Sequence, residues 1–140
     1  MNAQTEQPRK ISSKAKWTGI AIQAIVALFL AAGAISNLLM LPQAVEGAKQ
    51  YGFPESSVFG TGLALLICVL LYVIPRTSIW GALFLTAYLG GAVATHVHAS
   101  DPLVRILFPV LFAVLVWTSL ALRNRRLFDL LTFAGQRSEA

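Results

Sequence analysis

Two histidines and an aspartate near residue 100 are the side chains of this sequence best suited to chemistry. His96, His98 and Asp101 close a stretch, residues 87–102, that begins apolar and rich in small residues. Imidazole and carboxylate groups can bind metal ions, exchange protons or hold polar ligands. Because apolar sequence runs directly into titratable side chains here, we expect any chemistry of the protein in this stretch.

The spacing of these residues disfavours a metal site. Residues two apart on a helix point about 200° away from each other, so His96 and His98 cannot share an ion there. His98 and Asp101 could meet on one turn as an outer-loop site, but a metal needs a third or fourth ligand. The nearest further carboxylates, Glu46 and Glu55, belong to another loop. We therefore predict no metal site.

A pocket around His96 is the ligand site that the sequence favours. Ser36 and Asn37 lie near the end of an earlier apolar run, and Thr95 precedes His96. Polar side chains at membrane depth usually face protein or a water-filled cavity. We predict a shallow outward-facing pocket lined by Asn37, Thr95 and His96, with Ser36 nearby, in which His96 could contact a quinone head group. The alternative is hydrogen bonding between helices for Ser36 and Asn37, and an interfacial His96 without a ligand.

The composition indicates a membrane protein. Of the 140 residues, 56% are hydrophobic and only 12% are charged, with a mean hydropathy of +0.69. A soluble domain carries about twice that charged fraction. The formal net charge of +5 does not indicate nucleic acid, because the basic residues lie at the ends of apolar runs, where lipid head groups are the anionic partner. The single cysteine, Cys68, cannot form an intrachain disulfide.

Four apolar runs are long enough to cross a bilayer, at about residues 17–41, 57–74, 79–97 and 103–122. The sequence therefore predicts an all-α protein, a bundle of four transmembrane helices within residues 16–126. Residues 1–15 are polar and basic, and we expect a disordered tail there. Residues 127–140 are expected to form a C-terminal tail with a short interfacial helix.

Prolines mark the predicted connections between the spans. Pro42 is expected to end the first span, and residues 43–56 are expected to form a polar loop. Asp101 and Pro102 are typical of a helix start, with the aspartate capping free N–H groups and the proline at the first helical position. Arg105 either reaches outward or pairs with Asp101 four residues earlier.

The basic residues predict the orientation. An even number of spans puts both termini on one side of the membrane, and that side carries most of the basic residues: Arg9, Lys10, Lys14, Lys16, Arg76, Arg123, Arg125, Arg126 and Arg137. The other side carries Lys49 and Arg105. The positive-inside rule therefore places both termini in the cytoplasm. Trp17, Tyr72, Trp80 and Trp117 are expected at the same interface.

The third span carries small residues four apart. Ala87 and Gly91 form one stripe with Thr95, and Gly90 and Ala94 form the next. Helices in lipid associate by close packing, which small residues permit. We expect Ala87, Gly90, Gly91 and Ala94 to pack helices within one bundle. The alternative is a face for a second copy of the chain or for another membrane subunit.

No signature of catalysis is found in the sequence. It contains no Walker motif, no nucleophile elbow and no haem-binding motif, and no predicted span carries Asp, Glu or Lys. The lack of Asp, Glu and Lys within the spans argues against a proton-coupled transporter of the usual kind. We therefore expect no enzyme activity from this chain by itself.

The sequence resembles the DoxX-like membrane proteins, in particular their short bacterial members, from about residue 20 to residue 127. The most specific segments are Leu71-Tyr-Val-Ile-Pro-Arg-Thr77, Thr86-Ala-Tyr-Leu-Gly-Gly-Ala-Val-Ala-Thr-His96, and Asp101-Pro102 followed by Phe108-Pro-Val-Leu. The resemblance implies a four-helix membrane bundle. Members of the wider family are associated with quinone-linked sulfur oxidation, or with membrane complexes that handle thiol and oxidative stress.

Two positions depart from the pattern of that family. Met40 stands where a lysine is common, and Leu65, three residues after Gly62, stands where a glutamate is common. Losing both suggests a paired charge replaced by apolar packing, an exchange that costs little stability. If these charges carry function in relatives, this chain has lost it.

Three functions remain open from the sequence. The first is a small accessory subunit of a membrane redox complex that contacts quinone near Asn37 and His96. The second is a non-catalytic scaffold that binds a partner through the small residues of the third span. The third is a carrier for a small neutral solute, which would need a continuous polar path, and the sequence offers only Gln23, Ser36 and Asn37 for it.

Overall fold

The structure is a computed structural model that describes residues 12–124 and 127, and these residues form helices joined by short turns. The helices are α1 (Ser13–Leu38), α2 (Pro42–Gln50), α3 (Ser56–Val73), α4 (Ser78–His98) and α5 (Leu103–Ala121). By length and apolar composition α1, α3, α4 and α5 can each cross a membrane. The predicted all-α class and the four predicted spans are confirmed.

The ends of the chain differ in part from the prediction. The first span begins at Ser13, so residues 13–15 are helical and do not belong to the predicted tail. Residues 1–11 of that tail, and the predicted interfacial helix apart from Leu127, lie outside the described residues. Leu127 packs against the apolar core.

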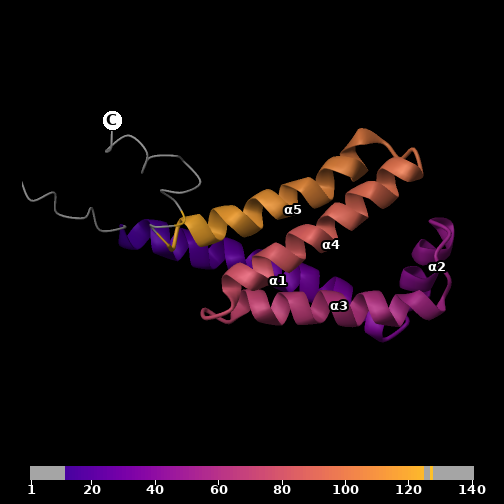
Figure 1. Ribbon diagram of the computed structural model, residues 1–140, viewed down its shortest axis with the longest axis horizontal. Helices are drawn as coiled ribbons and strands as arrows, with labels where there is room; N and C mark the ends of the chain where they lie inside the picture. Colours follow the sequence, from indigo (N-terminus) through magenta and orange to yellow (C-terminus); the bar gives the residue numbers. More distant parts are fainter. Residues whose placement is uncertain (1–11, 125–126, 128–140) are drawn as a thin grey trace, which may run out of the picture.

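The four long helices form a bundle that opens toward one end. α1 packs against α3 and α5, and α4 completes the bundle against the same two helices. Figure 1 shows α3 and α4 diverging from the turn that joins them, with α2 standing across the opening. We call the end with the start of α1 and the end of α5 the terminal end, and the opposite end the α2 end. The divergence of α3 and α4 leaves room between them at the α2 end.

Three glycines allow the close helix contacts. A Cβ atom on Gly81 would lie 2.1 Å from the backbone nitrogen of Tyr72, and one on Gly62 would lie 2.7 Å from Cβ of Asn37. A Cβ atom on Gly19 would lie 2.8 Å from the carbonyl oxygen of Ser119. These distances are too short for any side chain, so glycine is required where α4 meets α3 and where α1 meets α3 and α5.

The predicted packing role of Ala87, Gly90, Gly91 and Ala94 within the bundle is wrong. All four residues are exposed, and a Cβ atom on Gly90 or Gly91 would meet nothing within 4 Å. The reason is the divergence of α4 from α3, which separates these residues from the neighbouring helix. The helical spacing of the small residues predicted a smooth stripe along α4. It could not show which part of α4 touches another helix.

A buried polar network joins the helices at the terminal end. The hydroxyl of the fully buried Tyr72 lies 2.5 Å from Oγ of Ser119, which links α3 to α5. Gln23 donates a hydrogen bond of 2.7 Å to the backbone oxygen of Tyr72, and Arg123 donates one to Oε1 of Gln23. Tyr72 therefore belongs to the core and not to the predicted interfacial belt, in which Trp17 and Trp80 are exposed.

The predicted polar loop at residues 43–56 contains a helix. Pro42 does not simply end α1, which stops at Leu38, but is the first residue of α2. The carbonyl oxygen of Leu41 accepts hydrogen bonds from Ala44 and Val45, which starts the helix. Residues 43–50 are rich in alanine, glutamine, glutamate and lysine, which favour helix formation. The polar composition of this segment is also typical of a loop, so the sequence did not predict the helix. A short helix at the membrane surface needs only one apolar face.

The two positions that depart from the family pattern lie in different surroundings. Leu65 is 5% exposed in the core, where its side chain lies beside Gly33 of α1. Met40 follows the end of α1 and has a positive φ of 51°. The apolar side chain of Leu65 therefore packs between α1 and α3.

Candidate functional site

Four polar side chains meet at the α2 end of the bundle. Nδ1 of His96 lies 2.7 Å from Oδ2 of Asp101, and the hydroxyl of Tyr51 donates a hydrogen bond of 2.8 Å to the same oxygen. The Tyr51 hydroxyl also lies 3.2 Å from Nδ1 of His96. Arg105 binds the other carboxylate oxygen, Oδ1, at 3.2 Å. We call Tyr51, His96, Asp101 and Arg105 the polar cluster.

Four parts of the fold position the cluster. Tyr51 follows the last residue of α2, and His96 lies in the last turn of α4. Asp101 lies in the turn between α4 and α5, after Ser100 with a positive φ of 57°, and Arg105 lies in the first turn of α5. The backbone N–H of Asp101 donates to the carbonyl oxygen of His96, which fixes the turn. The carboxylate is thereby brought beside the imidazole ring.

The capping role predicted for Asp101 is wrong. Pro102 is the N-cap residue of α5, and no side chain caps this helix. Both carboxylate oxygens of Asp101 are instead used by side chains of the polar cluster. The sequence pattern correctly predicted where a helix starts, but three side-chain donors, from α5 itself and from two other segments, bind the carboxylate.

Hydrogen bonding shifts the acid–base properties of the cluster. The bonds from His96 and then from Tyr51 hold the pKa of the Asp101 carboxyl below its usual value. The bond to Asp101 raises the pKa of the Tyr51 hydroxyl. The ionised carboxylate can only accept hydrogen bonds, so Nδ1 of His96 carries the proton and donates a hydrogen bond to Asp101. Nε2 makes no hydrogen bond within the part of the chain that the structure describes.

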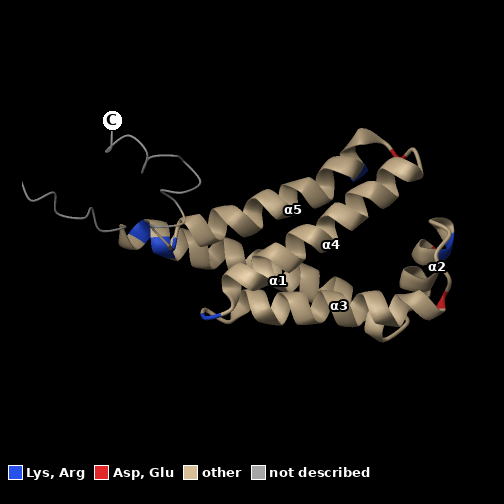
Figure 2. Ribbon diagram, viewed as in Figure 1, with Lys and Arg blue, Asp and Glu red and all other residues tan. Residues whose placement is uncertain are grey.

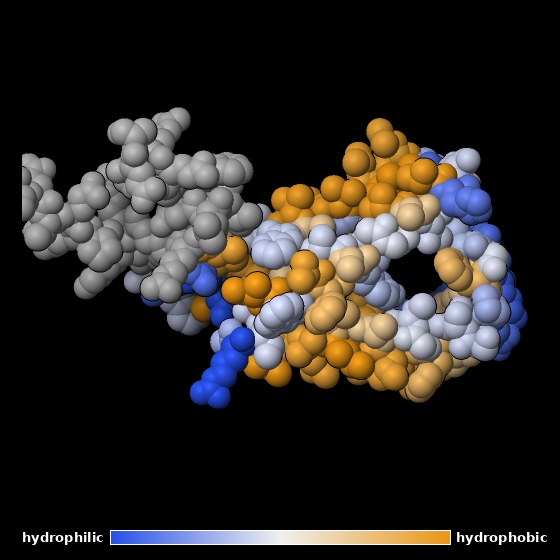
Figure 3. Space-filling view, in the orientation of Figure 1, coloured by the Kyte–Doolittle hydropathy of each residue, from blue (hydrophilic) through white to orange (hydrophobic). Residues whose placement is uncertain are grey.

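A pocket of about 460 Å³ lies beside the cluster, between α2, α3 and α4. Figure 3 shows this region as an opening in the molecular surface at the α2 end. The residues that line it are Ala48, Tyr51, Phe53, Ser57, Thr61, Ala87, Tyr88, Gly91, Ala92, Thr95 and His96. Most of them are apolar or small, and Ala87 and Gly91 leave space that larger side chains would fill. His96 therefore belongs to both the pocket wall and the polar cluster.

The structure separates the residues of the predicted pocket into two groups. Thr95 and His96 line the pocket, and Oγ1 of Thr95 donates a hydrogen bond of 3.0 Å to the carbonyl oxygen of Gly91. Ser36 and Asn37 lie elsewhere, at the end of α1, where Asn37 packs against Gly62 of α3. The sequence predicts that the two apolar runs end at a similar depth in the membrane, but α1 and α4 face different neighbours there.

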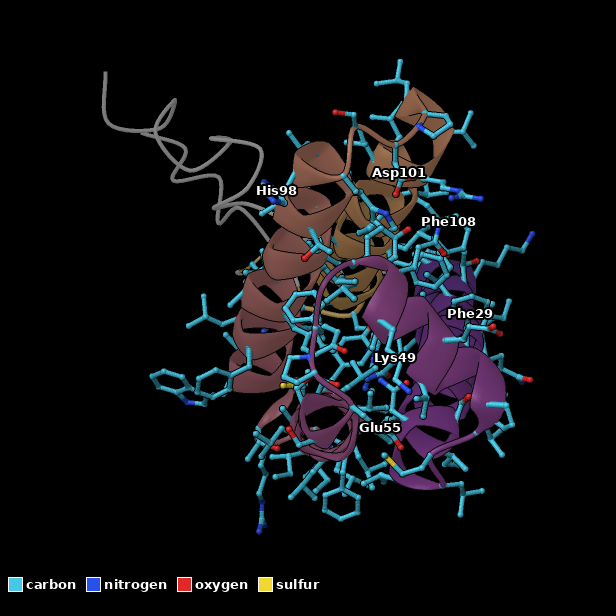
Figure 4. All side chains as sticks on the ribbon, turned by 90° about the vertical axis from the view of Figure 1, so that its right-hand side faces the viewer. Phe29, Lys49, Glu55, His98, Asp101 and Phe108 are labelled. Carbon is cyan, nitrogen blue, oxygen red and sulfur yellow. The ribbon has the colours of Figure 1, made fainter. Side chains whose placement is uncertain are left out.

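His98 does not join Asp101. Its side chain is exposed, and Figure 4 shows His98 and Asp101 on opposite sides of α4. Asp101 instead turns toward His96, five residues earlier, because the chain reverses after Ala99. Among the described residues, no three His, Cys, Asp or Glu side chains form a group that could hold a metal ion.

Tyr51 is the cluster residue that sequence reasoning missed. It lies 45 positions before His96 and 50 positions before Asp101 in the chain. Its ring also packs edge-on against the His96 ring, with the ring centres 5.2 Å apart. Recognising α2 as a helix would have placed Tyr51 at its end, although not beside His96.

Comparison with known proteins identifies the family of the chain. The model of the DoxX-like family matches residues 21–119, which is more than half of the sequence. Comparison with curated proteins and with solved structures gives no match. The matched segment includes most of all four long helices, α2, and every residue of the polar cluster. The chain belongs to the DoxX-like family of membrane proteins.

Proposed function

We propose that this protein is an accessory subunit of a quinone-linked membrane redox system and that its pocket at the α2 end binds the quinone head group. The observation that carries the proposal is that His96 belongs to both the pocket wall and the polar cluster. Its ring lines an apolar pocket, while its Nδ1 is held by the carboxylate of Asp101. Small-molecule sites typically combine an apolar wall with a few fixed polar groups in this way.

The fixed imidazole ring suits both redox forms of a quinone. With its proton on Nδ1, the neutral ring offers Nε2 as an acceptor for the hydroxyl group of a quinol. The doubly protonated ring offers the same atom as a donor to a quinone carbonyl group. Asp101 orients the ring and stabilises its positive charge in the second case. The same pocket can therefore hold either form without moving His96.

The pocket walls suit the apolar part of such a ligand. Phe53 and Tyr88 supply aromatic surface, and Gly91 and Ala92 leave space beside them. The pocket lies along the last turns of α4, which is itself long and apolar enough to cross a membrane. A ligand with an apolar tail could therefore keep its tail in lipid while its head group reaches His96.

We further propose that the protein lies in a bacterial inner membrane with both termini in the cytoplasm. Lys14 and Lys16 lie near the start of α1, Arg76 lies in the turn between α3 and α4, and Arg123 follows α5. These segments form the terminal end, whereas Figure 2 shows acidic residues at the α2 end. An excess of Lys and Arg marks the cytoplasmic side of membrane proteins. In this orientation the pocket opens toward the periplasmic side.

Photoaffinity labelling tests the proposed site. The purified full-length protein would be illuminated with a short-chain azido-quinone, and the labelled peptides identified by mass spectrometry. Labels are expected on residues 48–61 and 87–96, which contain the pocket walls. An excess of unlabelled quinone should remove them. Labels spread over all four long helices, or unaffected by the competitor, would contradict a specific site.

A second candidate function is a scaffold that binds another membrane subunit or a second copy of this chain. The observation that favours it is the exposure of Gly90 and Ala94, which present a smooth face of α4 to the surroundings. Small residues permit close helix association in lipid. A scaffold of this kind predicts that Gly90→Leu abolishes a complex that can be crosslinked in native membranes, while His96→Ala leaves that complex unchanged.

A further inference from the structure

A second pocket lies at the terminal end, far from the polar cluster. It has a volume of about 320 Å³ and is formed where the start of α4 meets the end of α5. Ser78 and Ile79 line it from α4, and Leu120 and Arg123 line it from the other side. Its wall therefore combines a guanidinium group with apolar side chains.

Arg123 brings a positive charge into this pocket without a carboxylate partner among the described residues. The half-buried side chain donates a hydrogen bond to Oε1 of Gln23, which is a neutral amide. The acidic residues of the described chain are Glu46 in α2, Glu55 at the start of α3 and Asp101 between α4 and α5, and these segments lie at the α2 end. A guanidinium group has five N–H donors in a fixed fork, so Arg123 retains donors for an anionic ligand.

The start of α4 adds to the positive character of the same pocket. Ser78 and Ile79 are the first residues of this helix of 21 residues, where backbone N–H groups have no partner within the helix. Thr77, the N-cap residue, does not cap them, because its hydroxyl donates to the carbonyl oxygen of Leu71 at 2.8 Å. The partial positive charge of a helix start therefore supplements the charge of Arg123.

We propose that this pocket binds the phosphate group of an anionic phospholipid, with Arg123 as the principal ligand. The terminal end also carries Lys14 and Lys16 in α1 and Arg76 in the turn between α3 and α4, which raise the local concentration of anions. Basic pockets between transmembrane helices are suited to phospholipid head groups. Ile79 and Leu120 supply apolar surface beside the phosphate, where the glycerol and the first acyl carbons lie.

Native mass spectrometry of the full-length protein tests this assignment. The purified protein would be offered equal amounts of phosphatidylglycerol and phosphatidylcholine, and the retained lipids counted. The wild type is expected to retain phosphatidylglycerol, and Arg123→Gln to retain it about five- to tenfold less. Arg76→Gln is the matched control, since it removes the same charge at the same end but outside the pocket. Equal loss in both variants would overturn the proposal.

A second pair of variants leaves the bond between Arg123 and Gln23 intact. Ile79→Glu places a negative charge on the pocket wall, and a carboxylate at a helix start does not harm the helix. It is expected to repel phosphatidylglycerol, whereas Ile79→Gln retains it. Inorganic phosphate identifies the source: competition at millimolar concentration indicates recognition of the free anion, and its failure indicates that the lipid body is needed. Equal retention of both lipids by the wild type would overturn an anionic site.

Discussion

The hydroxyl of Tyr51 and the imidazole ring of His96 lie 3.2 Å apart, and both donate to the same oxygen of Asp101. This relationship joins the end of α2 to the end of α4 and to the turn that follows it. It also holds α2 across the space between α3 and α4, where the pocket lies. The polar cluster therefore both orients His96 and fixes one wall of the pocket.

Removing the hydroxyl of Tyr51 should loosen α2. Tyr51→Phe keeps the ring that packs against His96 but loses the hydrogen bond to Asp101. Because one hydrogen bond is lost, we expect amide exchange in α2 to become roughly fivefold faster, with α3 unchanged. Hydrogen–deuterium exchange with mass spectrometry measures this directly. Unchanged exchange in α2 would show that other contacts hold the helix.

The attachment of α2 should weaken in acid. The pKa of Asp101 is lowered from 3.8 in the folded protein, so its stabilising effect is complete above that value and is lost as the pH falls through the lowered pKa. The pKa of Tyr51 is raised from 10.0, so its effect is present below that value and is lost only as the pH rises through the raised pKa. In the acid and neutral range, exchange of the α2 amides, corrected for intrinsic rates, should therefore rise only below about pH 4.

Asp101→Asn supplies the control for that pH dependence. The amide is similar in shape but does not titrate, so the acid transition in α2 should disappear while faster exchange persists at all pH values. A transition of the same size in Asp101→Asn would assign it to another group.

Substitution of Gly81 should destabilise the bundle more than substitution of Gly90. Gly81→Ala forces a methyl group against the backbone of Tyr72, which cannot give way locally. Overpacking of this kind costs about 1–3 kcal/mol of unfolding free energy. Gly90→Ala meets open space and should change stability by at most about 1 kcal/mol. Thermal unfolding of both variants in the same detergent gives the comparison, and equal melting temperatures would contradict the close contact between α3 and α4.

Filling the pocket should abolish quinone binding without affecting the fold. Gly91→Leu places a large side chain on the pocket wall, and Gly90→Leu places the same side chain one position away, where it does not line the pocket. We expect Gly91→Leu to weaken quinone binding at least tenfold and Gly90→Leu to leave it unchanged, as measured by equilibrium titration. Equal weakening in both variants would place the ligand outside this pocket.

The sequence was sufficient to predict the four spans because apolar runs of membrane-spanning length have few alternative structures in lipid. It also allowed the pairing of Arg105 with Asp101, which depends only on helical spacing. Tyr51 could not be placed beside His96, because that contact depends on how α2 crosses the bundle. The sequence could not show that Asn37 lies outside the pocket that Thr95 lines. Two side chains expected at the same depth in the membrane can face different neighbours.

The glycines also show which contacts between helices the sequence could not predict. Gly62 and Gly81 belong to no stripe of small residues recognised in the sequence but lie where helices touch, whereas Gly90 and Gly91 are part of a conspicuous stripe that does not. Gly62 packs where α3 meets α1 and Gly81 where α4 meets α3, and these contacts depend on how the helices are arranged in the assembled bundle.

The most direct test of the proposed function compares two histidines that are two residues apart. His96 lines the pocket and is held by Asp101, whereas His98 is exposed on the same helix outside the pocket. The dissociation constant of a short-chain quinol would be measured for the wild type, His96→Ala and His98→Ala in the same detergent. We predict that binding weakens at least tenfold in His96→Ala and is unchanged in His98→Ala. Equal affinities in all three proteins, or no binding to the wild type, would contradict a quinone site at His96.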